Sequence, residues 1–179
     1  GALLNRYWDD SDRPRDESWR EDVALAAEAE ARDAGTLWRD LRAAAESGWD
    51  FSSRWLADGQ SLGSIRTTRL VPVELNALLC GLEQAIAAEA EGLGDRTMAA
   101  DYAARADARA RAIADHLWHE AGGHYADFDL DRDMPSDRLT AAAAFPLFAG
   151  LASGERAARS AAALRRLLRP GGLMTTLCD

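Results

Sequence analysis

The stretch VELNALLCGLEQAIAAEAEGL, residues 73–93, indicates the fold most clearly. Its apolar side chains recur at steps of three and four from Leu75 to Ile86, which is the spacing of one face of an α-helix. Pro72 stands at the start, where a missing backbone N–H costs little, and Gly92 and Gly94 follow at the end. We therefore expect a helix over 73–93.

Further stretches on both sides of this helix also favour helix. Residues 18–33 are rich in Ala and Glu, and residues 36–47 carry an apolar stripe. Asp95 is a candidate N-cap for a helix over 95–120. Residues 139–153 are apolar on nearly every side and should be buried all round, whereas 155–168 is amphipathic and stops before Pro170. The sequence predicts an all-α fold of helical hairpins.

Three irregular segments separate these helices, at residues 7–17, 49–71 and 122–138. They carry aromatic and polar clusters rather than an apolar period. Loops that join helical hairpins gather at one end of such a fold and commonly carry its site. We therefore look for function in these segments.

Composition excludes several classes of protein. The chain has 179 residues, enough for one domain, with 47% apolar and 28% charged residues, as in ordinary globular proteins. All 21 basic residues are Arg, and 30 acidic residues give a net charge of −9, which argues against nucleic-acid and anionic-membrane partners. The absence of Lys excludes P-loop kinases and Schiff-base enzymes. The longest apolar run, 141–152, is shorter than the ~20 residues of a membrane span.

The segment ESGWDFSSRW, residues 46–55, is the strongest candidate for chemistry. Asp50 lies between Trp49 and Phe51, and apolar surroundings raise the pKa of a carboxyl so that it can act as a general acid. Aromatic rings are also the flat walls on which sugars stack. Gly48 would let the backbone approach a ligand closely. The structural alternative is a capped helix end with aromatic packing.

A second polar cluster, DRPRDESW, covers residues 12–19. Arg15 can donate hydrogen bonds to the hydroxyls of a polyol, and Glu17 can accept them. The alternative is a solvated helix start, where acidic residues are favourable in any case.

Metal and cofactor sites are not expected. The acid-rich segment 127–133 has Arg132 where a calcium loop needs Gly, so a short strand or turn with one polar face is expected there. His116 and His119 could pair on one helix face, with His124 nearby, but no third ligand is evident and we expect surface or capping histidines. Cys80 is expected to be a small buried apolar residue, and its distance from Cys178 fits no zinc spacing.

With these residues described, the chain resembles the trehalases of glycoside hydrolase family 37. Two residues depart from the family pattern. Asp16 stands where many relatives have Pro, which changes how rigidly Arg15 and Glu17 are held. Glu74 stands where relatives commonly have Asp. The motifs that carry the resemblance follow one another along the whole chain: 13–18 RPRDES, 46–55 ESGWDFSSRW, 70–76 LVPVELN, 123–130 GHYADFDL and 170–176 PGGLMTT.

The resemblance implies a partial (α/α)6 toroid whose long loops form a sugar pocket. It implies hydrolysis of α,α-trehalose to two glucose molecules with inversion, without a cofactor. Asp50 would be the general acid, and Arg15, Asp16 and Glu17 would bind sugar hydroxyls. Gly48 would contact the substrate through its backbone.

The resemblance also implies that residues 1–179 are the central part of one catalytic domain, truncated at both ends. The Glu that acts as general base in the family would lie outside the chain. We therefore expect the isolated chain to be inactive, to expose apolar helix faces, and to pair with the missing N- and C-terminal parts. The expected location is periplasmic or secreted, alternatively cytoplasmic. Two other hypotheses are a non-catalytic helical interaction module and an (α/α)6 glycosidase for another disaccharide.

Overall fold

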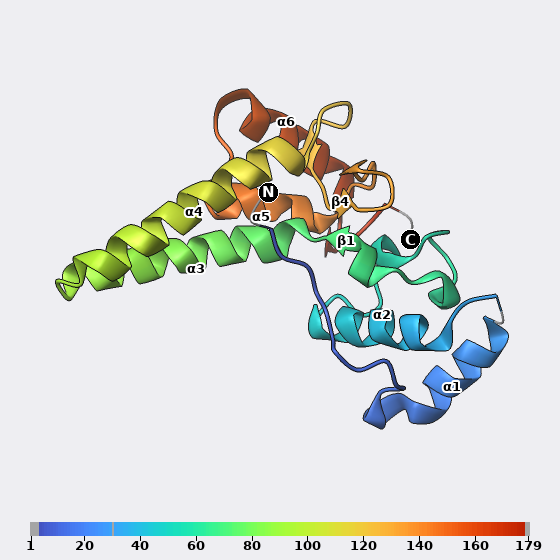
Figure 1. The fold of residues 1–179 in the computed structure, drawn as a ribbon. Helices are drawn as coiled ribbons and strands as arrows, with labels where there is room; N and C mark the ends of the chain where they lie inside the picture. Colours follow the sequence, from blue (N-terminus) through green and yellow to red (C-terminus); the bar gives the residue numbers. More distant parts are fainter. Residues whose placement is uncertain (1–3, 30, 178–179) are drawn as a thin grey trace. The chain divides into compact units, whose positions relative to one another are not determined.

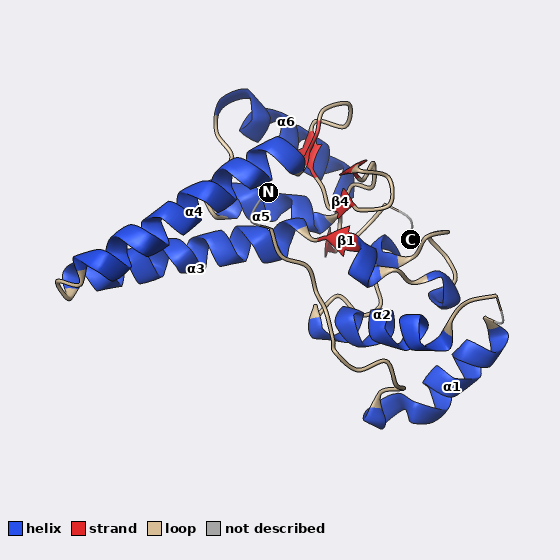
Figure 2. Ribbon diagram, viewed as in Figure 1, coloured by secondary structure: helices blue, strands red, loops and turns tan. Residues whose placement is uncertain are grey.

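The computed structural model describes residues 4–29 and 31–177, so Cys178 lies outside the described residues. The described chain divides into two compact units. We call Arg6–Val71 the N-terminal unit, and Pro72–Leu177 with residues 4 and 5 the C-terminal unit. Both are built mainly from helices, with short strands, as Figures 1 and 2 show.

The N-terminal unit is organised around α2. Asp33 caps this helix by accepting a hydrogen bond from Thr36 N–H at 2.8 Å. Helix α1 ends earlier than predicted, because Ala29 leaves helical geometry and its N–H closes the last turn on Leu25. The elements are η1 (Asp16–Ser18), α1 (Trp19–Glu28), α2 (Ala34–Glu46), η2 (Ser53–Trp55), η3 (Leu62–Ser64), η4 (Thr67–Arg69) and β1 (Leu70–Val71).

The core of the N-terminal unit forms where α2 meets the loop that follows it. Leu37 and Leu41 are fully buried, which confirms the apolar stripe predicted for 36–47. Trp55 is buried against them, and the ring of Tyr7 meets it edge-on at 6.2 Å. Burying one such side chain contributes roughly 1.5–3 kcal/mol, so this cluster can hold the irregular segments in place.

The C-terminal unit begins with two long helices that lie side by side (Figure 1). Asp95 caps the second of them by accepting from Met98 N–H at 3.0 Å, as predicted. None of the described helices is apolar over a stretch long enough to cross a membrane. The elements are α3 (Val73–Gly92), α4 (Arg96–His116), β2 (Trp118–His119), β3 (His124–Tyr125), β4 (Phe128–Asp129), β5 (Met134–Pro135), η5 (Ala141–Ala144), α5 (Phe145–Phe148), α6 (Gly154–Leu164), η6 (Arg165–Leu167), β6 (Leu168–Arg169) and β7 (Gly172–Leu173).

The strands of this unit pair as short antiparallel hairpins. Trp118 lies opposite Tyr125, Phe128 opposite Pro135, and Leu168 opposite Leu173. Between β4 and β5, the Asp129 carboxylate accepts from the Asp131 N–H at 3.0 Å. The acid-rich segment 127–133 is therefore a strand and turn, as predicted.

The buried face of α3 differs from the leucine stripe read from the sequence. Leu78 is 48% exposed and Leu82 is 55% exposed, whereas Ala77 and Cys80 are fully buried. Glu83 is also buried on this face, in an ion pair with an arginine of α4. The expectation that apolar helix faces would be exposed is confirmed, and so is the burial of Cys80.

The prediction of a fully buried helix over 139–153 is wrong. Regular helix covers η5 and α5 alone, and Phe148 is 83% exposed. Gly150 has a φ of +68°, and the Leu151 N–H turns back to the Pro146 carbonyl at 2.8 Å, so the chain leaves the helix there. An apolar sequence shows which side chains favour burial, but not whether a neighbour covers them.

Candidate active site

The segment 46–55 forms a compact loop at the carboxyl end of α2. Gly48 has a φ of +70°, a conformation that other residues rarely adopt. The Trp49 N–H donates to Ser47 Oγ at 2.9 Å. The Trp49 carbonyl accepts from Ser52 N–H at 2.6 Å and from Trp55 Nε1–H at 3.0 Å. The residue that precedes Asp50 is therefore fixed by several hydrogen bonds.

A buried arginine stacks with the two tryptophans of this loop. The guanidinium carbon of Arg54 lies 5.0 Å from the ring centre of Trp49 and 4.2 Å from that of Trp55. Such cation–π contacts are favourable, and more so away from water. The aromatic packing at a helix end that was the alternative for this motif is thus present, beside the features that suggest a site.

Asp50 and Gly48 are both exposed in this structure. The described residues therefore do not give Asp50 the apolar enclosure that was predicted from its aromatic neighbours. Phe51 is half-buried, and the guanidinium of Arg15 lies over its ring at 4.9 Å from the centre. This stacking brings the segment 12–19 against the Asp50 loop, as expected if both belong to one site.

Arg15 is held by Asp22 of α1. Its Nε–H donates to Asp22 Oδ2 at 3.0 Å, its NH2 to Oδ1 at 2.7 Å, and its backbone N–H to Oδ2 at 2.9 Å. The Asp22 hydrogen bond, against the effect of burial, raises the pKa of Arg15, aided by attraction to Asp22, Glu17 and Asp50. Asp22 is 1% exposed and was not predicted from the sequence. It orients a residue predicted to bind the sugar.

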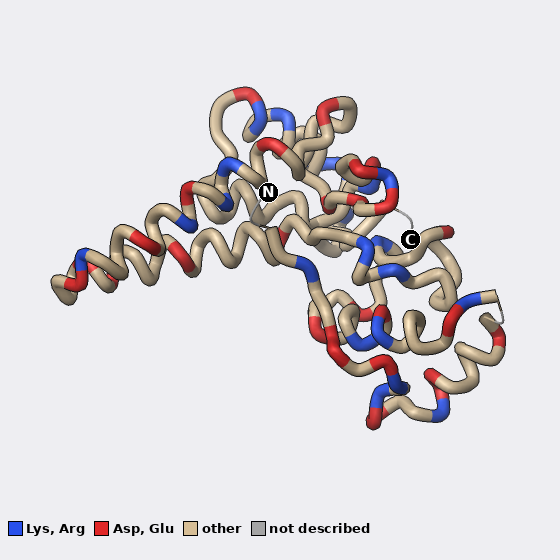
Figure 3. The backbone as a smooth tube through the Cα atoms, viewed as in Figure 1, with Lys and Arg blue, Asp and Glu red and all other residues tan. Residues whose placement is uncertain are grey.

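A polar cavity of about 300 Å³ lies beside these residues. Guanidinium donors and carboxylate acceptors face it together, which is the donor and acceptor set that binds sugar hydroxyls. Figure 3 shows acidic and basic residues alternating along the segment that leads into α1. Asp16 is exposed in η1. The residues that line the cavity are Asp9, Arg15, Glu17, Arg42, Ala45 and Glu46.

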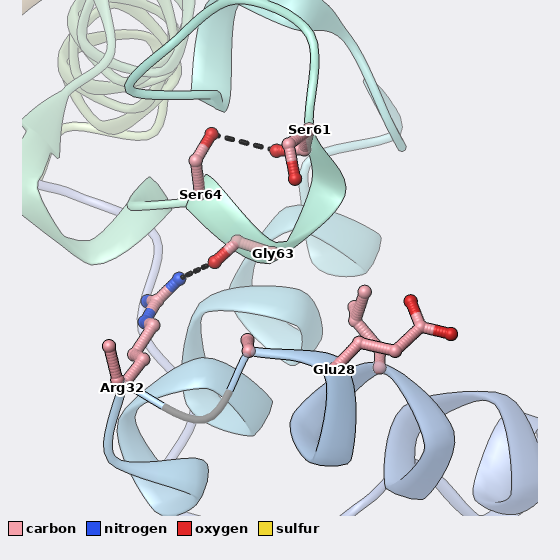
Figure 4. A pocket seen from close by; sticks show the side chains of 8 residues that line it. Glu28, Arg32, Ser61, Gly63 and Ser64 are labelled. Carbon is pink, nitrogen blue, oxygen red and sulfur yellow. Dashed lines mark hydrogen bonds between the residues drawn. The ribbon is translucent and has the colours of Figure 1, made fainter.

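A larger cavity, of about 570 Å³, lies elsewhere in the N-terminal unit (Figure 4). Its polar groups are paired with one another: Arg32 donates to the Gly63 carbonyl at 2.9 Å, and Ser64 Oγ donates to the Ser61 carbonyl at 2.7 Å. Glu28 lies at its rim (Figure 4). Its lining includes none of the residues predicted to carry chemistry.

The three histidines make local ring and backbone contacts. His116 packs edge-on against Phe128, while the rings of His119 and His124 lie 5.3 Å apart. His119 Nδ1 accepts from the Gly122 N–H at 3.0 Å, so the prediction of a capping histidine holds there. It is wrong for His124, which is buried, and burial lowers its pKa. Within 4–29 and 31–177 no three His, Cys, Asp or Glu side chains could together hold a metal ion.

Comparison with known proteins identifies the family of this chain. The family model described as trehalase matches residues 1–177. The chain therefore belongs to the trehalase family, which confirms the resemblance read from its motifs.

Two curated relatives show how much of each protein is matched. The chain is 59% identical over 177 residues to the periplasmic trehalase of Pseudomonas aeruginosa, covering 98% of this chain and 32% of that protein. It is 54% identical over 177 residues to the putative periplasmic trehalase of Salmonella typhi, covering 98% and 31%. The chain thus spans about a third of the length of the curated relatives it matches.

A solved structure has a similar fold. Neutral trehalase Nth1 from Saccharomyces cerevisiae superposes with a TM-score of 0.75 at 21% identity, over 97% of this chain and 36% of that one. The similarity confirms the predicted fold class, a mostly helical part of an (α/α)6 toroid.

Proposed function

We propose that residues 1–179 are the central part of one catalytic domain that hydrolyses α,α-trehalose to two glucose molecules. The observation that carries the proposal is the family match over residues 1–177, supported by the names of the relatives. The 32% share of the Pseudomonas aeruginosa protein is consistent with a central part whose neighbours lie outside these residues. The same names favour a periplasmic location.

Asp50 is the proposed general acid. Its loop is anchored through Trp49, and its exposed carboxylate is open to a ligand. The acid would give its proton to the glycosidic oxygen as the bond to the first glucose breaks. A bound sugar would displace water from this carboxyl and supply the enclosure that the described residues do not.

Arg15 and Glu17 are the proposed sugar-binding pair. The hydrogen bonds to Asp22 orient the Arg15 guanidinium before a ligand arrives, so less order is lost on binding. Glu17 accepts from hydroxyls across the same cavity. Asp16 completes this segment, and Gly48 would present its backbone to the substrate.

The proposed reaction inverts the attacked carbon. Inverting glycosidases hold two carboxyl groups roughly 6.5–9.5 Å apart, so that a water molecule fits between the base and the sugar. The base would come from a Glu outside these residues, so we expect the 179-residue chain to release no glucose by itself. Inversion at one carbon of α,α-trehalose gives one α-glucose and one β-glucose, whereas retention would give two α-glucoses.

The test is a chimera in which this chain replaces the matching 177 residues of the Pseudomonas aeruginosa periplasmic trehalase. We expect glucose release from trehalose in preference to maltose and sucrose, with equal α- and β-glucose in early proton NMR spectra. Asp50→Asn should lower kcat by about 10²–10⁴-fold, since an amide cannot donate an acid's proton. Asp115→Asn, an exposed change on α4, is the matched control. Faster cleavage of maltose or sucrose, or an active Asp50→Asn variant, would contradict the proposal.

A further inference from the structure

A second arginine, Arg42 of α2, lines the cavity of the candidate site beside Arg15. It stands one helical turn before Glu46, the last residue of α2, after which the chain runs into the Asp50 loop. The cavity therefore has guanidinium donors from two elements. Arg15 comes from the binding segment, and Arg42 comes from the helix that carries the Asp50 loop.

Contacts with the segment 9–14 fix the direction of the Arg42 side chain. Arg42 Nε lies 3.1 Å from Asp9 Oδ2 in an ion pair, and Arg42 NH1 donates to the Pro14 carbonyl at 3.4 Å. Asp9 is itself fixed, because its carboxylate also accepts from Ser11 N–H at 2.7 Å. A guanidinium that is oriented before a ligand arrives loses less freedom when the ligand binds.

Arg42 still has N–H groups to offer to a ligand. A guanidinium carries five N–H donors. The contacts above use Nε and NH1 of Arg42, whereas none of the described residues accepts a hydrogen bond from its NH2. Arg15 shows a similar arrangement, because Asp22 accepts from its Nε and NH2. In both cases an aspartate orients an arginine that lines the cavity and keeps donors for a ligand.

The charges around the cavity favour a neutral ligand with hydroxyl groups. An anion would be attracted by the two arginines but repelled by three acidic side chains. A hydroxyl can accept from a guanidinium and donate to a carboxylate, so it suits such a mixed lining. The charged residues of this lining are Arg15, Arg42, Asp9, Glu17 and Glu46.

We propose that Arg42 is a further substrate-binding residue, which donates from NH2 to a hydroxyl of trehalose and is oriented by Asp9. This inference rests on the proposed function, because the hydroxyl belongs to the substrate of that site. The hydrogen bond would join the substrate to α2, just before the Asp50 loop. Arg15 and Glu17 would hold the same molecule from the binding segment.

The alternative is a purely structural role, in which Arg42 only ties the segment 9–14 to α2. Arg39, on the same helix, provides the comparison. Its Nε–H donates to the Asp9 carbonyl at 3.1 Å, and its NH2 lies 3.9 Å from Asp12 Oδ2. Its side chain is 26% exposed, against 25% for Arg42, but it is not among the described residues that line the cavity. Both arginines contact the segment, and Arg42 alone of the two is placed to meet a ligand.

The test compares trehalose with analogues that lack the same hydroxyl on both rings, at carbon 2, 3, 4 or 6, as substrates of the chimera. Arg42→Gln should lower kcat/KM for trehalose by about 10–100-fold, the effect of one hydrogen bond from a charged donor. The analogue without the partner hydroxyl should already react slowly in the parent, and Arg42→Gln should slow it further by less than about threefold. For the other analogues the variant should lose the same factor as for trehalose.

Two more variants separate binding from structure. Arg39→Gln weakens the attachment of the same segment and should lower kcat/KM by one common factor for all substrates. Arg42→Lys keeps a positive charge beside Asp9 if Arg42→Gln does not fold. One ammonium cannot also reach the hydroxyl, so its loss should again be smallest for the analogue without that group.

The outcomes distinguish this inference from the proposed function. An active chimera in which the Arg42 variants lose the same factor on every analogue, or lose nothing, would overturn the binding role of Arg42 alone. A parent chimera that releases no glucose from trehalose would overturn the proposed function, and this inference with it.

Discussion

Helix α2 of the N-terminal unit and helix α3 of the C-terminal unit bury different kinds of side chain. Around α2 in the N-terminal unit, Leu37, Leu41 and Trp55 are fully buried, whereas the exposed large side chains of this unit lie outside α2, at Trp8, Trp19 and Val23. In the C-terminal unit, α3 buries small residues and a charged pair, while Leu78 and Leu82 are about half exposed. The candidate site lies beside the carboxyl end of α2, the helix whose apolar face is buried within the described chain. Under the proposed function, the exposed leucines are where we expect further parts of the catalytic domain to pack.

The largest expected effect of a single change on stability is in the N-terminal unit, at Asp22. Asp22→Asn removes the charge that pairs with Arg15, and breaking a buried ion pair costs about 3–5 kcal/mol. Urea unfolding followed by tryptophan fluorescence measures it, because five of the six tryptophans lie in this unit.

The matched control is Asp101→Asn in the C-terminal unit. Its ion pair with Arg105 joins two side chains that are each about half exposed, and exposed pairs contribute at most about 1 kcal/mol. If both variants lose stability equally, the buried pair is not what holds the site.

A second pair of variants probes the leucines directly. Leu41→Ala should lower the free energy of unfolding by about 2–5 kcal/mol, since it leaves a cavity in a closed core. Leu82→Ala should change it by within about 0.5 kcal/mol and should reduce self-association of the chain. Chemical denaturation and sedimentation velocity measure the two effects. A large loss of stability in Leu82→Ala would show that this leucine is already packed.

The smallest expected effects come from two glycines that have open space around them. A methyl group added at Gly48 or at Gly81 meets nothing within 4 Å, so backbone conformation alone decides the result. Gly48→Ala should cost about 1–2 kcal/mol, because φ is +70° there. Gly81→Ala, inside α3, should gain about 0.5–1 kcal/mol. Equal effects in thermal unfolding would mean that the Asp50 loop does not need its left-handed turn.

The sequence predicted those features that depend on neighbouring residues. Helix α3 starts at Val73 and ends at Gly92, within one residue of the expected bounds, because Pro72 and the glycines mark its ends locally. Asp95 likewise caps α4. The prediction of one buried helix over 139–153 was wrong, because Gly150 and the turn on Pro146 end the helix. The apolar composition of this run still favours burial.

The residues that hold the candidate site in place could not be predicted from the sequence. Asp22 is one of several acids in α1, and nothing nearby in the sequence shows that it, rather than Glu21, is buried against Arg15. The stacking of Arg15 on Phe51 joins positions 36 residues apart (51 − 15 = 36). Such contacts depend on tertiary packing, whereas the motif residues themselves were evident from their chemistry.

Asp22 also affects which substitutions the binding segment can accept during evolution. The family resemblance implies Pro at position 16 in many relatives, and a proline ring would stiffen the chain there by itself. In this chain Asp16 has no such ring, but Asp22 fixes both the backbone and the side chain of Arg15. Because Asp22 supplies this rigidity, we expect position 16 to accept other residues. We expect such a chain to tolerate substitution at the residue between Arg15 and Glu17, and to lose the support of its site through a single change at Asp22, seven residues after Arg15 (22 − 15 = 7).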